Sequence, residues 1–336
     1  MTEPETLVMA FAGLMALAVL VYTLLDGYDL GVGILLPSGQ GPDAAGQRDT
    51  MIASIGPFWD ANETWLVLAV GLLLIAFPAA YNLVLRELYL PATLMLAGLI
   101  LRGVSFDFRA KVDPARKRLW DYLFQFGSGL AAFMQGYMLG HYVVGLDSSP
   151  LNEAFAILSG CCVMAAYGYI GGAWLVMKTE GDLQRRAARW TRLCGVLTGI
   201  GVIAVCIVNP LVNPGVYERW FSLPGAILVL QIPVLSLLLF VINHQALKRI
   251  PYPEDHSCWL PFACAAGIFF LCFQALAYSF YPFAIPGRMT FMEAASAPES
   301  LRFILVGVVL VVPVILFYTA FSYRVFWGKA SELKYY

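Results

Sequence analysis

Long apolar runs, separated by short polar connections, make up most of the chain. A membrane-spanning helix needs about 20 apolar residues. The runs predict nine transmembrane helices, at residues 7–27, 52–77, 82–104, 121–144, 154–177, 193–210, 223–243, 259–281 and 301–327. No connection is long enough for a soluble domain. The sequence therefore predicts an all-α integral membrane protein with a single polytopic membrane domain over residues 1–336, expected as two four-helix bundles plus one additional helix.

The overall composition agrees with this class of protein. Hydrophobic residues make up 60% of the chain and charged residues 13%, and the mean hydropathy is +0.73, values typical of membrane proteins. A net charge of -1 gives no reason to expect a nucleic-acid partner. The seven cysteines lie mostly within apolar runs and form no CxxC pair or CxxCH haem-attachment motif, so we expect them to pack as small apolar side chains.

The cationic residues are distributed unequally between the two sides of the predicted bundle. All but four of the 21 Lys and Arg residues lie in residues 37–51, 102–118, 178–192, 244–258 or the C-terminal end, which includes Lys334. The four exceptions are Arg86, Arg219, Arg288 and Arg302. Cytoplasmic segments carry an excess of Lys and Arg, and an odd number of helices places the termini on opposite sides. We therefore expect a periplasmic N-terminus and a cytoplasmic C-terminus.

This orientation places several ionisable residues near the cytoplasmic ends of the first four helices. Charged groups inside a membrane are costly, and they are usually paired or functional. We expect a structural charge cluster made of Asp29, Arg102, Asp26, Asp107 and Asp121. In this cluster Asp29 and Arg102 are expected to hold the first and third helices together. For Asp29, a plain ion pair with Arg102 or a carboxylate in water at the helix end remain open alternatives.

The second predicted helix opens with an unusual polar stretch, GPFWDANETWL, at residues 56–66. Asp60, Glu63 and Thr64 fall on one face of a helix, and a carboxyl group at such a place is a candidate for proton exchange. We expect a proton path through Asp60, with Trp59 beside it and Glu63 one turn deeper. The alternative for Asp60 is a first-turn carboxylate that only interacts with the helix dipole.

The histidines do not form a pattern that binds a metal. His141, His244 and His256 lie at or beyond the ends of predicted helices, so no pair faces the middle of the membrane. Spacings typical of zinc and copper sites are absent as well. We expect no haem ligand, no metal site and no catalytic residue in this chain.

Several blocks together resemble subunit II of the cytochrome bd-type quinol oxidases. Residues 26–33 read DGYDLGVG and residues 59–66 read WDANETWL, and they resemble the family signatures DGFDLGVG and WDGNxxWL. Residues 102–121 resemble its R…FDYR…WD block, and residues 281–286 and 312–320 resemble FPFVxP and PxxLxYTxxxY. The chain departs from the family pattern at Tyr28, Ala61 and Glu63, where Phe, Gly and neutral polar residues are usual. The overall pattern is closer to the cyanide-insensitive branch.

The resemblance implies a nine-helix subunit of the bacterial cytoplasmic (inner) membrane. Its partner, subunit I, holds haem b, haem d and the quinol-oxidation loop. The complex oxidises quinol and reduces oxygen to water, and it takes protons from the cytoplasm without pumping them. By resemblance, Asp60 lies on a proton-uptake path at the subunit interface, and Asp29 and Arg102 are linked with the integrity of the haem site. Membrane lipids, a structural quinone and a small single-helix subunit are further expected partners.

Two other functions remain open from the residues alone. One is a secondary transporter that uses Asp29 and Asp60 as coupling sites, although such sites usually lie at the membrane midplane. The other is a membrane anchor with no role in proton transfer.

Overall fold

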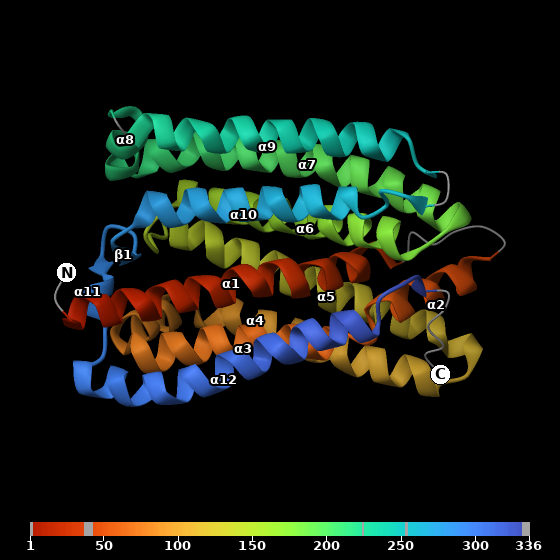
Figure 1. Cartoon of the computed structure of the whole chain (residues 1–336), viewed down its shortest axis with the longest axis horizontal. Helices are drawn as coiled ribbons and strands as arrows, with labels where there is room; N and C mark the ends of the chain where they lie inside the picture. The colour runs from red at the N-terminus through yellow and green to blue at the C-terminus, as the bar shows by residue number, and fades with distance from the viewer. Residues whose placement is uncertain (1–2, 37–42, 224, 253–254, 331–336) are drawn as a thin grey trace.

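The computed structural model describes residues 3–36, 43–223, 225–252 and 255–330, so Lys334 of the predicted cytoplasmic charges lies outside the described residues. Long helices run side by side along the longest axis of the molecule (Figure 1). The helices are α1 (Glu3–Leu35), α2 (Ala44–Ile55), α3 (Trp59–Ala76), α4 (Pro78–Lys111), α5 (Pro114–Val143), α6 (Pro150–Lys178), α7 (Gly181–Val212), α8 (Pro214–Phe221), α9 (Gly225–Lys248), α10 (Leu260–Phe280), α11 (Phe291–Ala294) and α12 (Pro298–Val325). A short antiparallel hairpin joins β1 (Phe283–Ile285) and β2 (Met289–Thr290).

The predicted helix boundaries differ from the structure mainly at the ends. Most helices are longer than the apolar runs, because their polar first or last turns remain helical; α7, for example, begins at Gly181 and includes a basic segment. The prediction of one helix over residues 52–77 is wrong at its start. Gly56, Pro57 and Phe58 form a turn that separates α2 from α3, since Pro57 lacks the N–H group that would continue the helical hydrogen bonds of α2.

Eight helices in the described ranges are long and apolar enough to cross a membrane: α1, α3, α4, α6, α7, α9, α10 and α12. Helix α5 is equally long, carries a basic first turn, and packs between α4 and α6. Apart from the small hairpin, the regular structure described is helical, and the structure thus confirms the prediction of an all-α membrane protein.

A close crossing of α1 and α6 positions the polar part of α1. Gly31 lies so near the Tyr167 carbonyl that an added Cβ would be 1.8 Å from its oxygen. On α6, a Cβ at Gly171 would be 2.6 Å from the backbone of Gly31. Small residues permit such close contact between membrane helices. The crossing buries the α1 segment from Asp26 to Gly33.

The two ends of the helix array differ in their connecting elements. Helix α8, the β1–β2 hairpin, α11 and the start of α12 lie at the end where α1 begins, and α2 lies at the opposite end (Figure 1). Arg219 on α8, Arg288 between the strands and Arg302 on α12 therefore belong to the end with few cationic residues.

Candidate functional site

Arg102 on α4 is the centre of a buried ion-pair cluster. Its side chain is 1% exposed, and its Nη1 atom lies 2.7 Å from Oδ1 of the fully buried Asp26 on α1. Its Nη2 atom contacts Oε1 of Glu63 on α3, a side chain that is 27% exposed. The guanidinium also lies 5.8 Å from the ring centroid of Trp59. One cation thus joins α1, α3 and α4 and connects a partly exposed carboxyl group to a buried one.

Asp29 lies next to this cluster, but its direct partner is an amide. Its buried Oδ2 atom accepts a hydrogen bond of 2.7 Å from Nδ2 of Asn62 on α3. The predicted pairing of Asp29 with Arg102 is therefore wrong in detail, because within the described ranges Asp26 supplies the α1 carboxylate that pairs with Arg102. Asp26 and Asp29 are three residues apart on α1, so their side chains point in different directions: Asp26 lies nearer to α4 and Asp29 nearer to Asn62.

Two tyrosines complete the polar contacts around Asn62. The Tyr28 hydroxyl accepts a 3.0 Å hydrogen bond from Asn62 Nδ2 and lies 2.5 Å from the hydroxyl of Tyr323 on α12. The Tyr323 hydroxyl donates to Asn62 Oδ1 at 3.2 Å. Sequence reasoning missed Asn62 and Tyr323. A signal was present for Asn62, which lies inside the block at residues 59–66, whereas Tyr323 lies three residues beyond the block at residues 312–320.

The other predicted site residues lie elsewhere. Asp60 and Asp107 are exposed on α3 and α4, and neither side chain has an ion-pair partner among the described residues. Asp121 belongs to a second cluster, in which it contacts Arg109 at 2.5 Å and Arg48 at 2.9 Å. The prediction of one charge cluster is thus wrong for Asp107 and Asp121. A sequence places charges along a helix, but their separation across helices depends on packing.

A row of neutral polar groups extends from the first cluster toward the middle of the molecule. Tyr22 lies one helical turn before Asp26 on α1, and its hydroxyl accepts a 2.7 Å hydrogen bond from Gln135 on α5. The Tyr167 hydroxyl on α6 donates to Oε1 of the same glutamine at 2.6 Å. These three side chains reach the wall of a cavity of about 1700 Å³.

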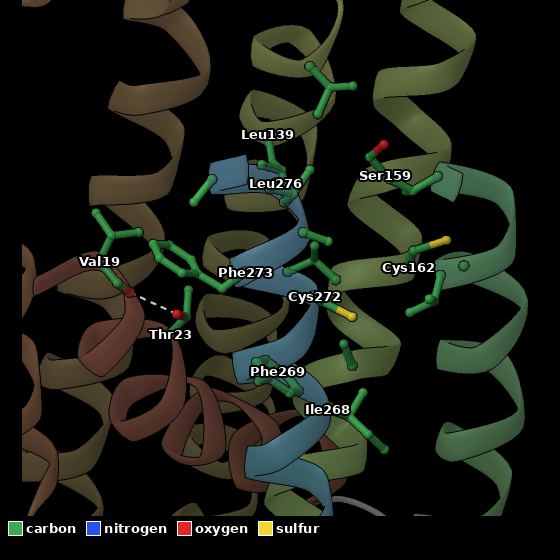
Figure 2. Close-up of a pocket in the computed structure, with 18 of the residues that line it drawn as sticks. Val19, Thr23, Leu139, Ser159, Cys162, Ile268, Phe269, Cys272, Phe273 and Leu276 are labelled. Carbon is green, nitrogen blue, oxygen red and sulfur yellow. Dashed lines mark hydrogen bonds between the residues drawn. The ribbon is translucent and has the colours of Figure 1, made fainter. Parts of the chain in front are cut away.

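The walls of this cavity are mostly apolar. Figure 2 shows Phe273 of α10 pointing toward Val19 and Thr23 of α1, while Ser159 and Cys162 line the opposite side from α6. Helices α7 and α9 contribute further lining residues. The cavity thus offers a large apolar space with a few hydrogen-bonding groups, which is typical of sites for apolar or amphipathic small molecules.

Potential metal-ligating side chains are scattered over the described part of the chain. In the part of the chain that the structure describes, no three His, Cys, Asp or Glu side chains are grouped so that they could hold a metal ion. His141 on α5 lies 3.4 Å from Glu153, which also accepts a hydrogen bond from Tyr137. Its ring is therefore used in contacts between α5 and α6.

Comparisons with known proteins give a consistent result. A family model described as "Cytochrome bd terminal oxidase subunit II" matches residues 7–326. The chain is 27% identical over 364 residues to cytochrome bd-I ubiquinol oxidase subunit 2 of Escherichia coli K12, with 93% of this chain and 92% of the relative covered. It is 26% identical over 336 residues to cytochrome bd ubiquinol oxidase subunit 2 of Bacillus subtilis, with 95% of each covered.

A solved structure is also similar in fold. The bd oxidase from Geobacillus thermodenitrificans matches with a TM-score of 0.76 at 17% identity, covering 96% of this chain and 99% of the other. At this identity the likeness supports the fold alone. The matched family region contains every block that carried the sequence resemblance, so the chain belongs to the cytochrome bd terminal oxidase subunit II family and is one subunit of an oxidoreductase complex of the bacterial inner membrane.

Proposed function

We propose that this chain supports a haem-bearing subunit I and supplies part of a cytoplasmic proton-uptake path for the oxidation of quinol and the reduction of oxygen to water. Haem b and haem d belong to subunit I in this proposal. The observation that carries it is the connection from the partly exposed Glu63 through Arg102 to the fully buried Asp26. Trp59 covers one side of this connection.

The charge balance of the cluster supports a role in holding protons. Three carboxyl groups, from Asp26, Asp29 and Glu63, surround the single guanidinium of Arg102. If all were ionised, the set would carry two excess negative charges in a poorly solvated place. Burial and like charges both disfavour this state. The arrangement therefore favours a proton held within the set, and Glu63 gives that proton a route to the surface.

Asp60 is proposed as the outer residue of this path. It lies one turn before Glu63 on α3, and its side chain is exposed. Exposed apolar residues lie on the same helix and on α4 and α12, among them Val67 and Phe321. A large exposed apolar surface is expected on a membrane protein, where lipid, subunit I or a small single-helix subunit covers it. We assign the part beside Asp60 to subunit I, so that a proton reaches Asp60 and then Glu63 along the subunit interface.

The proposed topology has nine crossings, with α5 as the additional one. Its polar first turn lowers its mean hydropathy, but α5 is packed between α4 and α6 and is long enough to span. Helices α1, α3, α4 and α5 would form one bundle, and α6, α7, α9 and α10 the second, with α12 outside both. The end with α8 and the hairpin, which holds few cationic residues, is assigned to the periplasm.

The apolar cavity is proposed as the place where this subunit holds a quinone or a lipid. A volume of about 1700 Å³ exceeds what one drug-sized molecule needs. Gln135 and Tyr22 at its wall supply hydrogen-bonding groups for a polar head. Quinone extraction followed by mass spectrometry of the purified complex tests this assignment, and a preparation that holds neither quinone nor ordered lipid contradicts it.

The experiment for the proton path compares two variants, Asp60→Asn and Glu63→Gln. Each replaces a carboxyl group with an amide of similar shape, so packing is kept. Because groups that transfer protons contribute large rate factors, oxygen turnover per haem d should fall about tenfold or more, with haem content and subunit assembly unchanged. Glu87→Gln is the matched control, since Glu87 lies on α4 in an exposed pair with Arg86. Wild-type turnover in both variants would contradict the path.

A further inference from the structure

The polar contacts around Asn62 close into a ring that joins three helices. Asn62 Nδ2 donates to the Tyr28 hydroxyl, and the single proton of Tyr323 is donated to Asn62 Oδ1. The contact of 2.5 Å between the two tyrosine hydroxyls therefore requires Tyr28 to donate to Tyr323. The second proton of Asn62 Nδ2 remains for Asp29. Every donor in the ring thus has a partner, and the amide has one favourable orientation.

The ring is held by side chains that are themselves well packed. The Tyr323 ring stacks on Phe58 with centroids 4.6 Å apart, and the Tyr28 ring stacks on Trp174 at 4.1 Å. Asn62 and Tyr28 are both fully buried. By contrast, most of the apolar residues of α12 are exposed. Tyr323 is thus a well-packed side chain on a helix that makes few other buried contacts with the rest of the chain.

We propose that Tyr323, together with Tyr28, is a positioning residue that fixes the Asn62 amide toward Asp29 and thereby determines which carboxyl group of the Arg102 cluster holds a proton. A carboxylate that accepts a hydrogen bond is favoured in its ionised form. The Asn62 amide therefore favours the ionised form of Asp29 against its burial and the nearby Asp26 carboxyl group, and so biases the proton of the cluster away from Asp29. This inference rests on the proton-uptake path proposed above.

Several titratable or charged groups surround Asp29 in addition to the Asn62 amide. The titratable and charged groups that face it are Asp26 and Tyr28 from α1, Glu63 from α3, Arg102 from α4 and Tyr323 from α12. From α6 and α10, the aromatic side chains of Trp174 and Phe262 pack against Tyr28. The Asn62 amide is the donor to Asp29 within the described ranges, so its orientation has a direct effect.

The test measures oxygen turnover against pH in the intact complex that carries Tyr323→Phe. This change keeps the stacking on Phe58 and removes one hydroxyl. Without a fixed donor, Asp29 ionises less readily, so the acid limb of the profile should move upward by about 0.5–1 pH unit, the value of one hydrogen bond. Tyr28→Phe should give a similar shift, and the double variant should not add to it, because both act on one amide. Tyr318→Phe is the matched control, as Tyr318 lies on the same helix and is 56% exposed.

The outcomes separate a positioning role from a structural one. An unchanged profile at normal haem content overturns the inference, and so does a loss of assembled complex or haem with an unchanged profile. A separate result decides the proposed path: wild-type turnover in both Asp60→Asn and Glu63→Gln removes that path. If Tyr323→Phe still shifts the profile in that case, the positioning of Asp29 stands without the path.

Discussion

At the scale of single residues, the site depends on one buried guanidinium. Arg102 has two carboxylate partners, Asp26 and Glu63, and a ring contact with Trp59. The sequence indicated that Arg102 pairs with a carboxylate of the first helix, because both belong to buried apolar runs. The sequence analysis chose Asp29 where the structure has Asp26, since the choice depends on how α1 rotates against α4.

Replacing Arg102 by Gln should prevent normal assembly. The change leaves Asp26 buried without its cation, and breaking a buried pair on one side costs about 3–5 kcal/mol. We expect a large loss of purified complex and of haem signal in the optical spectrum. Arg86→Gln is the control, because this side chain is 82% exposed and exposed pairs contribute little. Full assembly of the Arg102→Gln complex would contradict the role of the cluster, whereas adding Asp26→Asn to it should restore part of the yield.

At the scale of elements, the close crossing of α1 and α6 decides where the acidic residues lie. The four-residue spacing of Gly27 and Gly31 permits a close helix contact, and the structure has it against Tyr167. The partner helix was not predictable, because many helices in the chain contain glycine. The turn at Gly56 and Pro57 also escaped the apolar pattern, which continues across it.

Replacing Gly31 by Ala should separate α1 from α6. The added methyl group would lie 1.8 Å from the Tyr167 carbonyl oxygen, so backbone atoms must move and the α1 carboxylates with them. We expect less assembled complex and lower haem content than in wild type. Gly13→Ala on the same helix is the control, since a Cβ there has no neighbour within 4 Å. Equal yields of the two variants would show that the crossing does not constrain the site.

A salt bridge holds the segment that follows α12 against the connection between α9 and α10. Lys329 lies 2.6 Å from Asp255, which also accepts hydrogen bonds from Gln184 and Cys258. Burial tends to raise the pKa of Asp255, but the hydrogen bonds from Cys258, Gln184 and Lys329 outweigh it and lower the pKa to about 2. Because the pKa is lowered in the folded state, the contact stabilises the fold above its ordinary pKa and is lost as the pH falls toward about 2.

Asp255→Asn should therefore lower the Tm of the complex at neutral pH. The difference from wild type should stay constant down to a pH of about 4 and shrink below it. Thermal unfolding followed in detergent at a series of pH values measures this. Asp182→Asn, in an exposed pair with Arg185, is the control that should leave the Tm unchanged. A difference that grows on acidification would contradict the assignment.

At the scale of the whole molecule, membership in the oxidase family replaces the secondary-transporter alternative with a subunit of a terminal oxidase. The membrane class and the approximate positions of the spanning helices were predictable, because the length of an apolar run is enough to indicate both. The connection between Glu63 and Asp26 was not predictable, because it depends on how the three helices α1, α3 and α4 pack together. Its course, from a partly exposed residue on α3 to a buried one on α1, is what makes the proton-uptake proposal specific.

The most direct test of that proposal is the charge displacement that follows an oxygen pulse in proteoliposomes containing the fully reduced complex. Proton uptake through Glu63 predicts that Glu63→Gln slows the charge displacement about tenfold or more at unchanged haem content, while Glu87→Gln behaves as wild type. Charge displacement at the wild-type rate in both Glu63→Gln and Asp60→Asn would contradict the account.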